Sequence, residues 1–329
     1  MFDIITVGSA TVDVFVYTDK NQLIDIHGKG EDTQEFLAYP AGSKLLINEL
    51  HTFSGGGGTN SAVALARMGL KTAFLGVLGE DMNSEKILNE LKKEKIRFIG
   101  YQEIGMSGYS VILDSIAHDR TILTYKGTND KLRFDRVNKQ LLAAKWFYFS
   151  SMMSESYKSL EKLARYAEEH DIKVAFNPSS YLAEQGPGFL KEVLSRTTLL
   201  VLNKEEAGLI SNKKNITDML SALRALGPRM VIITNGKEGA HGLFGRDYYF
   251  IKAHKIKVVE ATGAGDAFAS SFAGAMIRGK GITSCLRLGL ANAESVLLHP
   301  GAKQDLLSWQ KLCKSIKSRP AKIIHKRIM

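Results

Sequence analysis

The feature that most limits the possible folds is the repeated alternation of short apolar runs with helical patterns. Five runs are rich in β-branched and aromatic side chains: Ile4 to Val7, Lys145 to Ser150, Lys173 to Phe176, Leu199 to Leu202 and Met230 to Thr234. The helical patterns between such runs are clearest at Asn83 to Lys95, Glu155 to Glu169 and Thr217 to Leu226. This order predicts an α/β fold with a mostly parallel central sheet flanked by helices. A length of 329 residues suits one such domain, 1–329.

A second group of strand-like segments does not follow this alternation. Its members are residues 12–17, 44–53, 109–113 and 121–125. The last two are separated by a short segment that suits a hairpin, so we expect a small β-sheet over one end of the central sheet. Residues Gln22 to Ser43 are rich in charged and turn-forming residues, and we expect a loop or an irregular insertion there.

The net charge of +10 is concentrated at the C-terminal end. Residues 303–329 hold eight Lys and Arg against one acid, Asp305. The apolar spacing from Trp309 to Ile316 predicts an amphipathic helix, which a basic, solvated tail is expected to follow. Because most of the excess charge lies in this tail, it does not indicate a specific nucleic-acid partner or a membrane.

Cysteine usage and hydropathy favour a reducing compartment. Cys285 and Cys313 form neither a disulfide framework nor a metal-ligand spacing. No run of about 18 residues is apolar enough to cross a bilayer. We therefore expect a cytoplasmic protein.

The strongest chemical motif is Thr262 to Asp266, which directly precedes a helix of small residues from Ala267 to Arg278. Glycines allow a tight turn, and the free amides at the start of the helix then form a site for an anion. An aspartate in the first turn can accept the proton of an attacking hydroxyl while the amides hold a phosphate. Taken alone, Asp266 could equally be a residue that only complements the helix dipole.

A second motif consists of Gly55 to Gly58 followed by Thr59, Asn60 and Ser61, again at the start of a helix. The missing Cβ atoms would let a ligand approach the backbone, and Asn60 offers a donor and an acceptor to a polyol hydroxyl. Taken alone, the motif is also compatible with a tight turn in which Asn60 or Thr59 caps the helix.

Together these motifs resemble the two signatures of the ribokinase-like carbohydrate kinases, the PfkB family. Gly-Gly-x-x-x-Asn lies near the start of the chain and Thr-Gly-Ala-Gly-Asp near its end. Further similarities lie between them, in the same order as in the family: Gly79-Glu80-Asp81, Asn177-Pro178, Asn203-Lys204-Glu205-Glu206, and Thr234-Asn235-Gly236 with Gly239. The resemblance covers nearly the whole chain and implies a ribokinase-like fold in which the small sheet is a substrate lid.

The resemblance also implies an activity, namely transfer of the γ-phosphoryl group of ATP to a hydroxyl of a sugar or sugar-like acceptor with Mg²⁺. Asp266 would be the base, and the amides of Gly263, Ala264, Gly265 and Asp266 would form the anion hole. The implied acceptor residues are Asp13, Gly56, Gly57, Asn60 and Arg120, the implied nucleotide residues are Asn203, Thr234, Gly236, Gly239 and Asn292, and Asn203 and Glu206 would hold Mg²⁺ through water.

Two positions depart from the family pattern. Gly57 stands where typical ribokinases have a lysine, so the resemblance does not identify ribose as the acceptor. Glu260 stands where many members have an aspartate near a monovalent-cation site, so potassium dependence is open as well.

Two other functions remain as alternatives. A nucleoside kinase of the same family would use Phe15, Tyr17 and Tyr109, near the lid, to stack on a base. A relative without catalysis could keep the scaffold to sense a ligand. Whichever function applies, a thin lid sheet would expose apolar side chains and free edges, and pairing of two lids would produce a homodimer.

Overall fold

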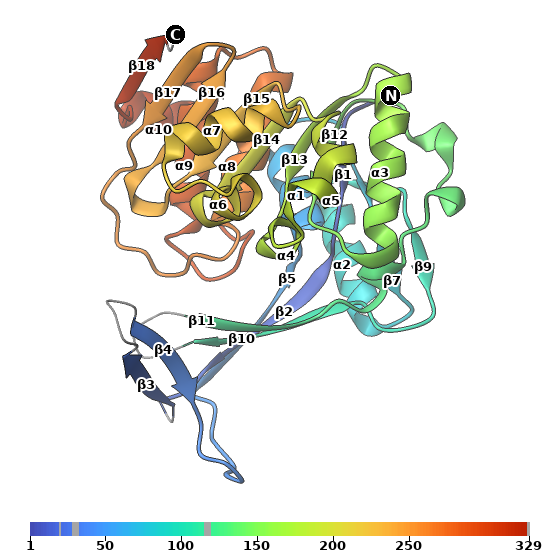
Figure 1. Cartoon of the computed structure of the whole chain (residues 1–329). Helices are drawn as coiled ribbons and strands as arrows, with labels where there is room; N and C mark the ends of the chain where they lie inside the picture. Colours follow the sequence, from blue (N-terminus) through green and yellow to red (C-terminus); the bar gives the residue numbers. More distant parts are fainter. Residues whose placement is uncertain (20, 28–32, 115–119, 328–329) are drawn as a thin grey trace.

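A ten-stranded central sheet organises the protein (Figure 1). The computed structural model describes residues 1–19, 21–27, 33–114 and 120–327. In spatial order the strands are β8 (Arg97–Phe98), β6 (Thr72–Leu75), β1 (Phe2–Val7), β12 (Ala144–Ser150), β13 (Lys173–Asn177), β14 (Leu199–Asn203), β15 (Met230–Thr234), β16 (Ala240–Phe244), β17 (Asp247–Ile251) and β18 (Ile323–Arg327). Strands β8 to β15 in this order pair in parallel, whereas β16, β17 and β18 are antiparallel. The predicted α/β class is confirmed.

Helices cover both faces of this sheet because its buried strands carry apolar side chains on both sides. In β1, Ile5 belongs to one hydrophobic cluster and Ile4 to the other, and neither is exposed. On the first face lie α3 (Ser154–Glu169), α4 (Ser180–Ala183), α5 (Gly186–Leu194), α6 (Lys204–Ser211) and α7 (Ile216–Ala225). On the second lie α1 (Gly57–Arg67), α8 (Ala264–Ile277), α9 (Ile282–Val296) and α10 (Trp309–Ser318), and α2 (Met82–Lys93) packs beside α1.

The small sheet has the order β11-β10-β2-β5 and projects beyond the central sheet (Figure 1). Its strands are β2 (Thr11–Tyr17), β5 (Glu49–Gly55), β10 (Gly108–Asp114) and β11 (Arg120–Tyr125). The predicted lid and its hairpin are confirmed, since Tyr109 pairs with Tyr125 in an antiparallel ladder. The strand expected over residues 44–53 begins only at Glu49.

Residues expected to be a loop form a second hairpin instead. Strands β3 (Gln22–His27) and β4 (Thr33–Ala38) are antiparallel, with Leu23 opposite Leu37 and Ile24 opposite Phe36. The expectation of irregular structure was wrong because the charged residues between the apolar ones hid a local cross-strand pairing.

The remaining short elements connect the larger ones. They are β7 (Val77–Gly79), β9 (Tyr101–Glu103) and the 3₁₀ turns η1 (Gly127–Lys131), η2 (Phe134–Arg136), η3 (Lys139–Leu141) and η4 (Gly236–Glu238).

The C-terminal region differs from its expectation beyond the predicted helix. Helix α10 forms with Leu312 buried. The segment after it is exposed, as expected of a solvated end, but it is ordered as strand β18, which extends the edge of the central sheet. There His325 stacks on Tyr249, with 4.4 Å between ring centroids, and lies 2.8 Å from Asp247. Within the described part of the chain, no helix has both the length and the apolar character required to cross a membrane.

Candidate active site

A cavity of about 420 Å³ lies where the parallel strands of the central sheet end. Ligands of open α/β sheets characteristically bind at this edge. The lining residues come from the ends of neighbouring strands and the start of α8: Ser9, Ser150, Ser151, Asn177, Asn203, Thr234, Gly263, Gly265 and Asp266. Gly57, Lys126, Tyr181 and Glu206 complete most of the wall.

Asp266 occupies the first turn of α8 and is the acid of the cavity that lies nearest the second glycine motif. Its Oδ2 accepts a hydrogen bond of 2.8 Å from Nδ2 of Asn60, 206 residues away in the sequence. Burial raises the pKa of Asp266, whereas the Asn60 hydrogen bond and the charge of Lys303 act in the opposite direction. The side chain is thus a carboxylate held in one orientation and made more basic than an exposed aspartate.

The turn before α8 depends on glycine. Gly263 has a φ of 80°, and a Cβ there would lie 2.4 Å from the Cβ of Ala302. The first amides of α8 have no intrahelical acceptor, and Ala264 N donates only a long 3.4 Å bond to Ala261 O. The positive end of the helix therefore faces the cavity with unused donors.

The turn before α1 also permits a close approach. A Cβ on Gly57 would stand 3.5 Å from Oδ1 of Asp266, so the absence of a side chain keeps the space beside that carboxylate open. Oδ1 of Asn60 and Oγ of Ser150 are buried, and neither forms a hydrogen bond with the described residues. Ser150 lines the cavity, whereas Asn60 lies behind its wall and contacts it through Asp266.

Asn203 and Glu206 form a reciprocal capping box at the start of α6. Asn203 Oδ1 accepts from Glu206 N at 2.8 Å, and Glu206 Oε2 accepts from Asn203 N at 2.9 Å. Burial, with a smaller effect of nearby Asp266, raises the pKa of Glu206 to about 7. Both residues also line the cavity.

The described residues include no group of three or more His, Cys, Asp or Glu that could bind a metal directly. The oxygens of Asn203 and Glu206 fit Mg²⁺, which keeps much of its hydration and uses few protein ligands. Burial raises the pKa of Glu206, and a cation bound nearby would lower it again by stabilising the ionised carboxylate.

Some residues assigned to the nucleotide lie elsewhere. Thr234 lines the cavity, but Gly236 and Gly239, in the turn after β15, do not. Asn292 is fully buried inside α9, where its Nδ2 donates to Ser271 Oγ at 2.6 Å and its Oδ1 accepts from Leu307 N at 2.8 Å. The assignment of Asn292 to the nucleotide is corrected, because both ends of its amide bind protein groups.

Two of the residues assigned to the acceptor, Asp13 and Arg120, are in the lid, and a third, Gly56, lies just beyond it. Asp13 in β2 is 7% exposed, accepts a hydrogen bond of 2.8 Å from Thr11 Oγ1, and has a pKa raised by burial. It does not line the main cavity. Gly56, with a φ of 92°, immediately precedes α1. Arg120 begins β11, and its side chain lies outside the described part of the structure.

Sequence reasoning missed Lys303, which was counted with the basic tail. Its side chain is 4% exposed, and its Nζ lies 2.7 Å from Oε2 of Glu90, 2.8 Å from Oγ1 of Thr59 and 3.3 Å from Oγ of Ser54. This ammonium therefore joins the root of lid strand β5 to α1 and α2. Its charge also favours the ionised forms of Asp13 and Asp266. A single lysine in a basic stretch gives no sequence signal of such a contact.

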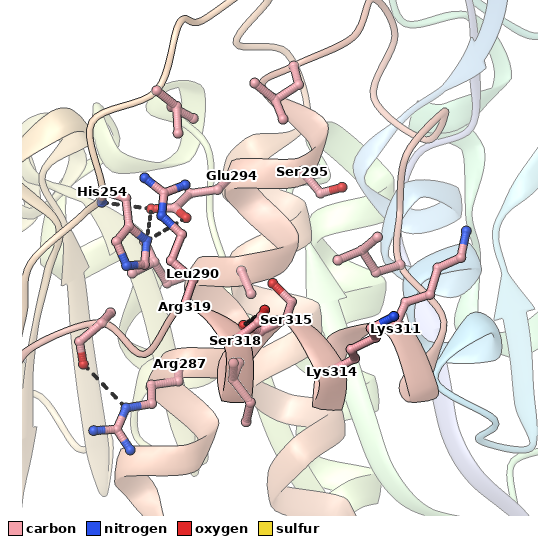
Figure 2. A pocket seen from close by; sticks show the side chains of 16 residues that line it. His254, Arg287, Leu290, Glu294, Ser295, Lys311, Lys314, Ser315, Ser318 and Arg319 are labelled. Carbon is pink, nitrogen blue, oxygen red and sulfur yellow. Dashed lines mark hydrogen bonds and ion pairs between the residues drawn. The ribbon is translucent and has the colours of Figure 1, made fainter.

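A second cavity, of about 390 Å³, lies between α9, α10 and the segment that follows β17 (Figure 2). It shares no lining residue with the first cavity. Glu294 accepts from the backbone of His254 at 2.8 Å and contacts its Nδ1 at 2.8 Å, while Arg287 donates to Ala321 O at 3.3 Å. Glu294 is thus paired with His254, and Arg287 and Arg319 bind backbone carbonyls, whereas Lys311 and Lys314 also line the cavity.

Comparisons with known proteins agree with this fold. The model of the pfkB family carbohydrate kinases matches residues 1–309. Ribokinase of Bacillus subtilis is 28% identical over 87% of this chain and 90% of that protein, and cytidine kinase of Thermococcus kodakarensis is 26% identical over 84% and 96%. The structure of Arabidopsis thaliana ribokinase complexed with ribose and ATP superposes with a TM-score of 0.79 at 21% identity, covering 96% of this chain and 99% of that one.

Fold and cavity together define a ribokinase-like α/β protein. The chain belongs to the pfkB family of carbohydrate kinases. It is therefore an ATP-dependent kinase whose acceptor is a sugar or a nucleoside.

Proposed function

We propose that the protein transfers the γ-phosphoryl group of ATP to a hydroxyl of a sugar or sugar-like acceptor, with Asp266 as general base. The observation that carries this proposal is the position of Asp266. Its carboxylate lies at the wall of the cavity, in the first turn of α8, and Asn60 holds its Oδ2 at 2.8 Å.

The proposed reaction uses that geometry directly. A sugar hydroxyl is a poor nucleophile at neutral pH, and a base within hydrogen-bond reach assists it. The hydroxyl proton passes to Asp266 as the acceptor oxygen bonds to the γ-phosphorus and the bond to the bridging oxygen of ADP breaks. The amides of Gly263 to Asp266, at the positive end of α8, stabilise the charge on the transferred group.

Other residues would hold the substrates in place. Asn203 and Glu206 would bind Mg²⁺ through water, and the bound cation would offset the charge of the phosphates. Thr234 would contact the nucleotide. On the acceptor side we assign Asp13, Gly56, Gly57, Asn60 and Arg120.

The environment of the lid aromatics favours a sugar over a nucleoside. Phe15 is 2% exposed and packs against Phe53, with 5.5 Å between ring centroids. Tyr17 contacts His51, and Tyr109 packs against a hydrophobic cluster of the domain. Phe15 is thus part of the lid core and has little free surface on which a base could stack.

A substrate screen tests the proposal. Pentoses, hexoses, sugar phosphates, nucleosides and inositol are each incubated with MgATP, and ADP formation is measured. We expect acceptor-dependent ADP formation, which the Asp266→Asn variant loses. Acceptor-independent ADP formation in both proteins would contradict the assigned role of Asp266, and preference for a nucleoside would replace the sugar by the second candidate.

A further inference from the structure

One cation lines the cavity without an ion pair to a described acid. Lys126 directly follows β11, at the root of the lid, and is the only Lys or Arg among the described residues that line the cavity. Its backbone carbonyl accepts from Asn129 N at 3.2 Å, but its ammonium forms no hydrogen bond or ion pair with any described residue. Its ammonium lies 4.4 Å from the centroid of the Tyr181 ring. Burial lowers the pKa of Lys126, and Asp130, the nearby acid, only partly opposes this effect.

The backbone holds Lys126 at this place firmly. Asn129, three residues further on, accepts from Ala10 N and donates to Ala10 O, both at 2.9 Å. Thr128 N donates to Met106 O at 2.9 Å. The turn that carries Lys126 is therefore tied to the segment after β1, and the lysine is positioned by a rigid support.

Lys126 lines a narrow extension of the cavity that lies toward the ends of β1 and β12, away from the proposed nucleotide residues. It shares this extension with Ser9, which follows β1, with Ser151, which follows β12, and with Asp130. Asn203 and Thr234 end β14 and β15, and the sheet order is β15-β14-β13-β12-β1. At about 4.8 Å between neighbouring strands, the end of β14 is about 14 Å from that of β1.

The groups around Lys126 suit an anion. Ser151 Oγ and Ser179 Oγ are 2.6 Å apart, so one hydroxyl hydrogen of this pair remains free to donate to a ligand. An ammonium beside hydroxyl donors binds carboxylate or phosphate oxygens as a point charge. Asp130 lines the same extension, but it forms no ion pair with the partly buried ammonium of Lys126, so this cation can still bind an anionic ligand.

We propose that Lys126 binds an anionic group of the acceptor, so that the preferred acceptor is a sugar acid or a sugar phosphate rather than a neutral sugar. This inference rests on the proposed kinase function and names the chemical class of its acceptor. This role of Lys126 also accounts for the absence of a lysine at position 57, beside Asp266, because Lys126 supplies the cation from the end of β11.

The test compares acceptors that share a carbon skeleton. Gluconate, glucose 6-phosphate and glucose form one set, and ribonate, ribose 5-phosphate and ribose form another. We expect kcat/KM for at least one anionic member to exceed that for its neutral analogue by tenfold or more. Lys126→Met, which keeps the apolar stem, should reduce this ratio about 10- to 100-fold through KM, as expected for a lost charged hydrogen bond. Lys126→Arg should restore most of the ratio.

Two controls separate this inference from the proposed function. Lys131→Met removes an exposed lysine that binds only the carbonyl of Ile104, at 3.0 Å, and should leave the ratio unchanged. Affinity for MgADP, measured by thermal shift, should be equal in all variants. The inference is overturned if no anionic member is preferred, or if Lys126→Met raises KM for MgATP instead, which would place the lysine on the donor phosphates. If the inference fails in either way but the protein still phosphorylates a neutral acceptor, the proposed kinase function is retained.

Discussion

The buried carboxyl of Glu206 leads to a quantitative prediction about stability. Its side chain is 7% exposed, and its pKa is about 7 against 4.5 for an unperturbed Glu. Because the folded pKa is raised, the stabilising effect is fully present below pH 4.5 and is lost as pH rises through about 7. Integrated from pH 5 to pH 8, a shift of this size removes roughly 2 to 3 kcal/mol of unfolding free energy.

The substitution Glu206→Gln isolates this effect. The amide oxygen can still accept from Asn203 N, so the cap remains, but the side chain no longer ionises. Without ligand, the variant should match wild type near pH 5 and exceed it by roughly 2 to 3 kcal/mol at pH 8. MgADP should stabilise wild type more than the variant, since a cation favours the carboxylate.

Urea unfolding followed by circular dichroism at pH 5, 6.5 and 8 measures these differences. Glu205→Gln is the matched control: Glu205 is exposed in the same helical turn, and its charge is the smallest of the effects on the pKa of Glu206, so its difference from wild type should change with pH far less than that of Glu206→Gln. A difference between wild type and Glu206→Gln that does not change with pH would refute the reasoning.

Two further predictions concern the lid. Lys303→Met removes a buried ammonium and leaves Glu90 and Ser54 without this partner, whereas Thr59 keeps its bond to Gly55 O, so unfolding in urea should show a loss of roughly 3 kcal/mol; unchanged stability would exclude the assigned role of Lys303. The lid exposes Leu46 by 78%, Leu50 by 58% and Leu123 by 57%, which favours lid pairing. Light scattering should therefore give a dimer mass that Leu50→Asp reduces, whereas a monomer mass at all working concentrations would contradict this prediction.

Local patterns predicted most of the fold. The strands of the parallel sheet, the helices and the lid hairpin follow from periodicity, because each pattern reports which side of an element is buried. The β3 and β4 hairpin lacked that signal, since its apolar side chains remain exposed: Ile24 by 47% and Ile26 by 54%. Strand β18 was missed because its ladder partner, β17, lies far earlier in the chain.

The candidate site was predictable only in part. Glycine turns before helices are local, so both motifs could be found without a structure. The bond between Asn60 and Asp266, the burial of Lys303 and the position of Lys126 depend on contacts between distant segments. For Asn292 the sequence predicted a ligand contact that the structure does not support, because its side-chain amide binds Ser271 and Leu307 inside the protein.

Turnover of Asp266→Asn tests the central claim most directly. Asn keeps the size of the side chain and an oxygen that can accept from Asn60, but it is not a base. Turnover with the identified acceptor should fall about 10²- to 10⁴-fold, while ATP affinity and melting temperature stay close to wild type because the anion hole consists of backbone amides. Asp218→Asn, an exposed first-turn acid of α7, controls for the loss of a helix-dipole charge and should not reduce turnover. Turnover within a few-fold of wild type in folded Asp266→Asn would show that Asp266 is not the base.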